Sequence, residues 1–294
     1  MQSRGAAAIE VHMQLILDHV SHIYDAHTPH ARGALRDVSL QIGEGSFIGL
    51  IGHTGSGKST LIQHLNGLLK PTEGSVYADG KDIADHEYDR RRLRGKVGLV
   101  FQYPEHQLFE ADVFKDVCFG PKNLGLPEKE VELRAYEALM QVGLEQEVYN
   151  QSPFDLSGGQ KRRVAIAGVL AMQPEVLILD EPTAGLDPGG SREILSLIAS
   201  LQKERGMTVL LVSHSMEDVA AYADRIIVMN EGSVFMDGTP AEVFAQADAL
   251  REIGLNVPAA TEVCRRLYEA GLRVRPDVTT AEEACEEILC CFSR

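Results

Sequence analysis

The segment SFIGLIGHTGSGKST, residues 46–60, decides the fold of this chain. Its first six residues are nearly all apolar, as in a central parallel strand that is buried on both faces of its sheet. The loop at 52–59 follows directly and fits the pattern GxxxxGK[ST], whose backbone N–H groups wrap phosphate oxygens. Residues 58–68 then predict a helix, whose positive N-terminal end points at the bound anion. Strand, loop and helix in this order predict an α/β domain that binds a nucleoside triphosphate.

The residues of this loop have separate expected roles. Gly55 and Gly57 let the backbone approach a phosphate without a Cβ in the way. We expect Lys58 to reach the β- and γ-phosphates of ATP and Ser59 to ligate Mg²⁺. A chance glycine-rich turn is disfavoured, because the loop stands between a buried strand and a helix. The predicted phosphate-binding residues are Gly52, His53, Thr54, Gly55, Ser56, Gly57, Lys58, Ser59 and Thr60.

A second motif, VLILDE at residues 176–181, predicts a metal ligand and a catalytic base. Asp180 ends an apolar strand, where a carboxylate is costly unless it meets a cation or hydrogen-bond donors, and Mg²⁺ is its natural partner. Glu181 projects differently and is the best candidate to polarise the attacking water as general base. The alternative is that both carboxylates only cap a helix, which their place after the phosphate loop disfavours.

Two further predicted strands, 97–101 and 208–212, end in polar residues. Gln102 carries a carbonyl and an amide, so it can contact Mg²⁺ or water and sense the γ-phosphate. His214 can hydrogen-bond the γ-phosphate. Either residue alone would be interpreted as structural, but their order along the chain favours a role in catalysis.

Tyr24 is the candidate to stack on the adenine ring. It lies 28 residues before Gly52. A plain surface tyrosine is the alternative, and Tyr77 and Phe47 are other aromatic residues in this part of the chain.

The block LSGGQ at residues 156–160 is a second anion receptor, with hydroxyl and amide donors, two glycines and a helix after it. Two such receptors in one chain cannot both grip one triphosphate. We therefore expect a head-to-tail pair of subunits with ATP between them, in which Lys58 of one chain and Ser157 and Gly159 of the other meet each nucleotide. The segment AGLD at 184–187 is expected to lie along that interface. The predicted residues of this second half-site are Ser157, Gly158, Gly159, Gln160 and Asp187.

Composition excludes several classes of protein. The 294 residues carry a formal net charge of −15, which argues against a general affinity for nucleic acid or anionic lipid. Five scattered cysteines indicate reduced thiols, neither a disulfide framework nor a zinc site, although Cys290 and Cys291 stand side by side. No signal peptide is visible, and the longest apolar run is far shorter than the roughly 18 residues that a membrane span needs.

The rest of the pattern predicts an α/β class with a mixed sheet. Residues 9–15 and 38–42 read as strands, Asp79-Gly80 as a hairpin turn, and 226–229 with 233–236 as a second hairpin. Three helices are expected: one at 127–140, one after the LSGGQ block, and one at 190–204. Gly143 suits the C-terminal cap of the first. Strands stop near 240, and 241–248, 259–270 and 281–291 read as helices. We expect a nucleotide-binding domain at 11–240, with a helical subdomain at about 103–172, and a small helical extension at 241–294.

These motifs, in this order, resemble those of ATP-binding cassette (ABC) ATPases over residues 11–240. A narrower resemblance is to the ATPase subunits of energy-coupling factor transporters, including cobalt-type members. It is carried by GHTGSGKSTL at 52–61, LNGL at 65–68, VFQYPEHQLF at 100–109, FGPKN at 119–123 and RRVAIAG at 162–168. The segments SPFDL at 152–156 and VLAM at 169–172 are more similar to the second of the two paralogous ATPases of that family.

The resemblance implies a peripheral subunit on the cytoplasmic face of the cell membrane, in an importer of a vitamin or a transition-metal ion. It implies a second ATPase subunit, alike or paralogous, a transmembrane coupling subunit, and a membrane protein that binds the substrate. It also implies a groove at 103–110 for a coupling helix that carries an arginine, with Glu105 and Glu110 as candidate partners or, alternatively, as solvated surface carboxylates. The tail after 240 resembles a segment that supports the dimer.

Three alternatives are weighed against this interpretation. A soluble ABC ATPase that acts on nucleic acid or ribosomes is disfavoured by the acidic charge, the single cassette and the lack of a long heptad run. A degenerate cassette used as a scaffold is disfavoured because Lys58, Asp180, Glu181 and His214 are all present. A kinase with a phosphate loop has no use for LSGGQ. The sequence leaves open the transported substrate and whether the dimer is of like or unlike chains.

Overall fold

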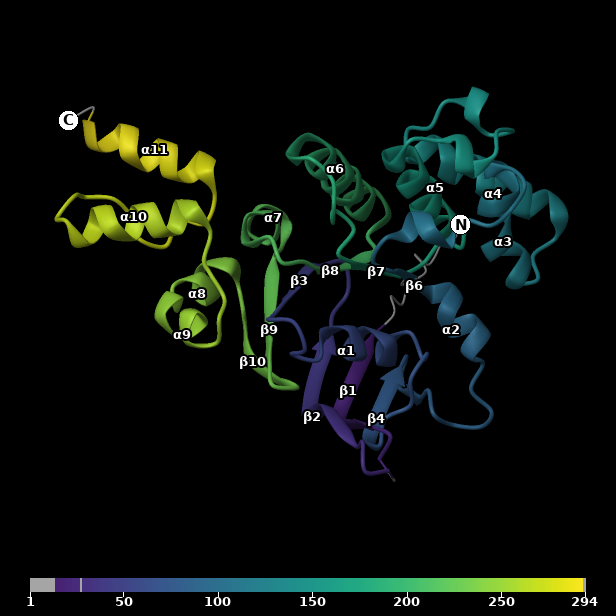
Figure 1. Ribbon diagram of the computed structural model, residues 1–294, viewed down its shortest axis with the longest axis horizontal. Helices are drawn as coiled ribbons and strands as arrows, with labels where there is room; N and C mark the ends of the chain where they lie inside the picture. The colour runs from purple at the N-terminus through teal and green to yellow at the C-terminus, as the bar shows by residue number, and fades with distance from the viewer. Residues whose placement is uncertain (1–13, 27, 293–294) are drawn as a thin grey trace, which may run out of the picture.

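The computed structural model describes residues 14–26 and 28–292, and its centre is a six-stranded mixed sheet (Figure 1). The strand order is β10-β9-β3-β8-β7-β6, and all neighbours are parallel except β9 and β10. Ile48 at the centre of the sheet lies between Leu210 and Arg225. The strands are β3 (Phe47–Ile51), β6 (Val97–Val100), β7 (Val176–Asp180), β8 (Thr208–Val212), β9 (Arg225–Asn230) and β10 (Ser233–Gly238). The predicted α/β class with a mixed sheet is confirmed.

A second, antiparallel sheet has the order β2-β1-β4-β5. The predicted strand at 9–15 falls mostly outside the described residues, and the strand that is described runs on to Tyr24. Its register against β2 shifts after Leu17 and again after Val20, so the alternation that marks a strand is lost there. The turn predicted at Asp79-Gly80 joins β4 to β5. The strands are β1 (Leu15–Tyr24), β2 (Arg32–Ile42), β4 (Glu73–Ala78) and β5 (Lys81–Asp82).

Helices cover both faces of the central sheet (Figure 1). Helix α1 (Lys58–Leu65) lies between the two sheets, where Leu61 and Ile62 are buried with side chains of both. Helices α6 (Pro188–Arg205) and α7 (Met216–Tyr222) cover the opposite face. The strand β3 is therefore buried on both sides, which explains its nearly unbroken apolar sequence.

A group of helices follows β6 along the chain. The helix predicted at 127–140 is α4, and Gly143 follows it with a left-handed φ of 70°, as a C-terminal cap requires. Helices α2 and α3 were not predicted, because five of the seven residues of α2 are basic and α3 contains Pro121. The elements are α2 (Arg90–Lys96), η1 (Pro104–Gln107), α3 (Val113–Asn123), α4 (Glu128–Gln141), η2 (Gln146–Val148), η3 (Pro153–Asp155) and α5 (Gly158–Leu170).

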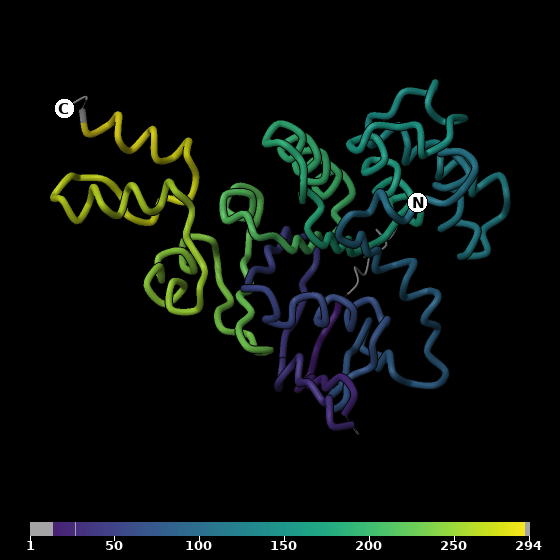
Figure 2. Tube along the Cα trace, in the orientation of Figure 1, coloured from purple at the N-terminus to yellow at the C-terminus, as the bar shows by residue number. Residues whose placement is uncertain are grey.

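The last helices are α8 (Pro240–Phe244), α9 (Ala247–Glu252), α10 (Ala259–Glu269) and α11 (Ala281–Phe292). The single helix predicted at 241–248 is wrong, because Gln246 leaves the helical region with φ −88° and ψ 41° and separates α8 from α9. This break lets both Phe244 and Leu250 reach the main hydrophobic core. Helices α10 and α11 share a small core of their own and extend from one side of the molecule, opposite α3 to α5 (Figure 2). In residues 14–26 and 28–292, no helix is long and apolar enough to span a bilayer.

Candidate functional site

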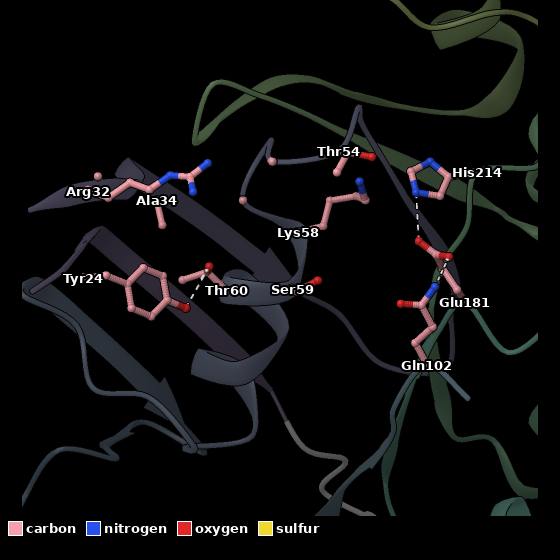
Figure 3. A pocket seen from close by; sticks show the side chains of 13 residues that line it. Tyr24, Arg32, Ala34, Thr54, Lys58, Ser59, Thr60, Gln102, Glu181 and His214 are labelled. Carbon is pink, nitrogen blue, oxygen red and sulfur yellow. Dashed lines mark hydrogen bonds and ion pairs between the residues drawn. The ribbon is translucent and has the colours of Figure 1, made fainter. Parts of the chain in front are cut away.

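The carboxyl ends of β3, β6, β7 and β8 meet at one edge of the sheet, because these strands are parallel. A pocket of about 520 Å³ lies there, and the end of β1 and the start of β2 close its far side. Figure 3 shows Gln102, Glu181 and His214 at one end and Tyr24 at the other. The structure thus brings these predicted residues together around one pocket: Tyr24, Thr54, Gly55, Gly57, Lys58, Ser59, Thr60, Gln102, Glu181 and His214.

The loop between β3 and α1 has the shape that an anion site needs. Gly57 has φ 104°, and a Cβ on it would lie 2.7 Å from the carbonyl oxygen of Ala34, so only glycine fits. No side chain among the described residues caps the start of α1, which leaves its first N–H groups to a phosphate. Gly52, His53 and Ser56 shape the loop without lining the pocket, and the His53 ring lies 3.1 Å from Oδ1 of Asn230.

Lys58 is folded back onto its own loop. Its ammonium donates to the carbonyl oxygens of Gly52, at 2.6 Å, and His53, at 3.1 Å. Burial lowers the pKa of Lys58, while the charges of Glu181 and Asp180 oppose that shift. The ammonium is therefore placed between the loop and two carboxylates, where a triphosphate would supply further negative charge.

Glu181 is held from two sides (Figure 3). Nε2 of Gln102 donates to its Oε2 at 2.8 Å, and Nε2 of His214 lies 2.8 Å from its Oε1. The sequence predicted that Gln102 contacts Mg²⁺ or water and senses the γ-phosphate, and that His214 hydrogen-bonds the γ-phosphate. In this structure both side chains contact the predicted base instead, so they orient the carboxylate that would activate water.

Asp180 and Ser59 form an oxygen-rich corner beside the phosphate loop. Burial and the neighbouring charge of Glu181 raise the pKa of Asp180, while Lys58, His214 and a hydrogen bond from Ser59 partly offset this. A cation would relieve that excess of negative charge. Hydroxyl and carboxylate oxygens are the hard ligands that Mg²⁺ takes, so the residues present fit this ion.

Tyr24 lines the pocket, whereas Phe47 is buried in the core and Tyr77 lies elsewhere on β4. The Tyr24 hydroxyl is 3.2 Å from Oγ1 of Thr60. Sequence reasoning missed Arg32, which also lines the pocket and pairs directly with Tyr24 across β1 and β2. Such cross-strand neighbours share one face of a sheet, but only the register of the two strands reveals the pair.

The LSGGQ block lies outside this pocket. Ser157 caps helix α5: its hydroxyl accepts from the Gln160 backbone at 3.3 Å, and the Gln160 side chain accepts from the Ser157 backbone at 3.0 Å. Gly158 and Gly159 form the first residues of the helix. Asp187 likewise caps α6 through the N–H groups of the two residues after Pro188, which depresses the pKa of its carboxyl. The block therefore presents a helix N-terminus that the chain's own pocket does not use.

Comparison with known proteins adds four matches. The ABC transporter family model matches residues 35–184. The energy-coupling factor transporter ATP-binding protein EcfA2 of Symbiobacterium thermophilum is 58% identical over 276 residues, 94% of this chain and 96% of that one. Among solved structures, cbiO1 from Clostridium perfringens, described as part of the ABC transporter complex cbiONQ, matches with a TM-score of 0.71 and 42% identity over 81% of this chain and 93% of that one. The dimeric ATP-binding cassette MJ0796, bound to ADP and Pi, matches with a TM-score of 0.67 and 33% identity. The match covers 76% of this chain and 98% of that one.

Proposed function

This chain belongs to the ATP-binding subunits of energy-coupling factor transporters in the ABC transporter family, and from that we propose that it hydrolyses ATP at a site shared head to tail with a second cassette. It is the ATPase subunit of an importer of this type. One observation carries the proposal of a shared site: the pocket gathers the residues for a triphosphate, while the capped helix start at Ser157 lies outside it.

Each residue of the pocket then has a task. Lys58 and the loop amides bind the β- and γ-phosphates, and Tyr24 stacks on the base. Ser59 and Asp180 would hold Mg²⁺, which when bound neutralises charge on the phosphate oxygens. Glu181 accepts the proton of the attacking water. Gln102 and His214 hold the Glu181 carboxylate in place until the γ-phosphate competes for them.

The second subunit supplies what this pocket lacks. Its Ser157 and Gly159 would approach the γ-phosphate from the open side, with Asp187 along the interface. A dimeric relative of similar fold that is bound to ADP and Pi supports this arrangement. The helix extension from α10 to α11 projects from the body and is the segment that we assign to support of the dimer.

A groove of about 490 Å³ between α2, α3, α5 and the segment after Gln102 is the proposed seat of the coupling subunit. Phe109 and Phe119 pack edge to face in its wall, 4.9 Å between ring centroids, and both are exposed. Asp116 fixes the wall by accepting from the N–H groups of Phe109 and Glu110, at 2.8 and 2.9 Å. An amphipathic helix of a membrane subunit suits such an apolar, open groove.

Glu105 and Glu110 flank the residues of this segment that line the groove, and they do not share one role. Glu105 is bound to Arg162 and is not available to an arginine of the partner. Glu110 remains half-exposed at the end of the segment and is the partner that we retain. We propose, from what the family resemblance implies, that the assembly works on the cytoplasmic face of the membrane and that its cargo is a vitamin or a transition-metal ion.

The decisive experiment uses Glu181→Gln. We expect this variant to bind ATP with normal affinity, to hydrolyse it at least about 100-fold more slowly, and to accumulate as an ATP-bound dimer of cassettes. Size exclusion with light scattering measures the dimer, alone and with a second cassette present. Phosphate release measures turnover.

Two double variants show whether the site is shared. Adding Ser157→Arg to Glu181→Gln should preserve ATP binding but abolish the dimer. The bulky arginine lies outside the chain's own pocket and obstructs the surface that would meet the ATP of the second cassette. Adding Lys58→Ala should abolish ATP binding itself. A dimer that still forms with Ser157→Arg would refute the shared site, and normal turnover in Glu181→Gln would remove Glu181 as base.

A further inference from the structure

An ion pair between the buried Arg162 and the partly buried Glu105 joins the segment after Gln102 to helix α5. Arg162 is 2% exposed, and Glu105 lies in η1. Nη2 of Arg162 is 2.9 Å from Oε1 of Glu105, and its Nε is 3.2 Å from Oε2. Burial raises the pKa of Glu105, but the hydrogen bond from Arg162 and further donors outweigh it and leave the pKa below its ordinary value. The carboxylate is therefore charged at neutral pH, and the pair is intact there.

The same guanidinium also binds the turn that follows Glu181. Its Nη1 donates to the carbonyl oxygens of Pro182, at 2.9 Å, and Ala184, at 3.0 Å. The donors of a guanidinium point in fixed directions from one plane. A single rigid group therefore sets the position of this turn relative to Glu105.

Both of the segments that Arg162 joins contain a residue with a left-handed backbone. The φ angle is 48° at Glu181 and 54° at Tyr103. Residues with a side chain adopt this region rarely and keep it only where surrounding contacts hold them. The contacts of Arg162 hold the chain just after both positions, at Pro182 and at Glu105.

We propose that Glu105 and Arg162 are positioning residues for ATP hydrolysis: the pair holds the 182–184 turn and thereby the direction in which Glu181 presents its carboxylate. The proposal rests on the proposed role of Glu181 as general base. Neither residue of the pair lines the ATP pocket, so both act through Glu181. Gln107, two residues after Glu105 in the same short helix η1, lines the groove, so the pair also connects the groove to the turn after Glu181.

The test compares Arg162→Lys with Arg163→Lys in the full-length chain assembled with its partner subunits. Lysine keeps the charge, but its donors all lie on one nitrogen and cannot reproduce the two-nitrogen contact with the carboxylate together with the contacts to both carbonyls. We expect kcat for ATP hydrolysis to fall by about 10- to 100-fold, with KM unchanged within about twofold. Arg163 is the matched control, because it also binds a carbonyl, of Val142, and a carboxylate, of Glu193, but not this turn. Arg163→Lys should keep the wild-type kcat.

A charge swap, Glu105→Arg with Arg162→Glu, separates positioning from stability. The swap restores an ion pair but replaces the donor that faces Pro182 and Ala184 by a carboxylate. We expect the Tm of the swapped chain to lie above that of Arg162→Glu alone and closer to the wild-type value, while its kcat for ATP hydrolysis stays low. A wild-type kcat in the swapped chain, or in a folded Arg162→Lys chain, overturns the proposal.

Glu181→Gln in the same assay keeps the two proposals apart. Normal turnover in Glu181→Gln would end the role of Glu181 as base, and with it the basis of this inference. An inactive Glu181→Gln beside a fully active Arg162→Lys would end only the positioning role. If thermal unfolding shows that Arg162→Lys does not fold, Glu105→Gln carries the same expectation of lower kcat at unchanged KM, and a wild-type kcat in that variant overturns the proposal.

Discussion

At the residue scale, the site consists of side chains that end parallel strands and of side chains that tertiary packing brings to them. Lys58, Gln102, Glu181 and His214 each follow an apolar strand, and parallel strands bring such positions to one edge. Arg162 could not be predicted, because its partner Glu105 is 57 residues away and lies on a different element. A residue such as Arg162 can be assigned to the site only when the tertiary structure shows which distant residues it contacts.

Arg32 gives the first prediction at this scale. Arg32 is exposed and lines the pocket beside Tyr24, its neighbour across β1 and β2, where its guanidinium can contact the nucleotide by a charge-assisted or cation–π interaction. Arg32→Ala should weaken ATP binding about fivefold, equivalent to about 1 kcal/mol, with little change in kcat. Titration with fluorescent ATP measures this. Arg36→Ala, on the same strand but outside the pocket, is the control, and equal affinities in both variants would exclude a role for Arg32.

At the scale of elements, the predictions succeeded where a segment is buried on two faces. Strands β3, β7 and β8 read as continuous apolar runs and were predicted to within a residue or two. Strand β2 begins six residues before the predicted strand, and helix α7 was not predicted at all. The first six residues of β2 are mostly exposed and carry few apolar positions, and α7 has only seven residues, too few to show its period.

Helix α1 gives a prediction about pH. His64 is fully buried, and burial together with the nearby His22 lowers its pKa from 6.5 to about 4. Between these values the unfolded chain binds a proton that the folded chain rejects, so the free energy of unfolding falls as the pH falls, by up to about 3 kcal/mol. Above pH 6.5 the effect vanishes.

Urea unfolding at pH 7.5 and pH 5.0 measures this contribution. His64→Gln can still donate to the Leu69 carbonyl, the present partner of the ring, and should lose less stability between the two values than the wild type. The exposed His86→Gln should behave like the wild type. An unchanged pH dependence in His64→Gln would contradict the prediction.

At the scale of the whole molecule, the chain forms a large body that includes α8 and α9 and a small C-terminal one made of α10 and α11. The main core takes in Phe244, Leu250 and Leu255, whereas Cys264, Val278 and Ala284 form a separate small cluster. Hydropathy along the sequence could not show this, because it marks where helices lie and not which core each one joins. The resemblance between sequences, by contrast, identified the family from motif order alone.

Truncation tests this division. A chain that ends after residue 258 keeps α8 and α9 and should retain a Tm close to that of the full protein. A chain that ends after residue 238 loses the burial of Phe244 and Leu250, each worth about 2–5 kcal/mol. It should unfold at a much lower temperature or fail to fold. Similar Tm values for the two truncations would show that α8 and α9 add nothing to the main body.

The groove gives a prediction for the assembled transporter. Glu110→Lys should reduce uptake of the cargo by reconstituted complexes several-fold, because it would repel the arginine that we propose on the coupling helix, while ATP binding by the free chain stays normal. Vesicle uptake and ATP titration measure the two effects. Glu252→Lys, an exposed charge reversal at the end of α9, is the control. Unchanged uptake in Glu110→Lys would remove this carboxylate from the docking site.

The position of β3 between β8 and β9 has a consequence for synthesis on the ribosome. Ile48 emerges about 160 residues before its neighbour Leu210. At 5–20 residues per second this delay lasts roughly 10–30 seconds. During that time the apolar strand β3 has neither of its lateral partners, so a chain whose synthesis stops before β8 exposes a segment prone to aggregate. We expect nascent chains of this subunit to need a chaperone until translation has passed β9.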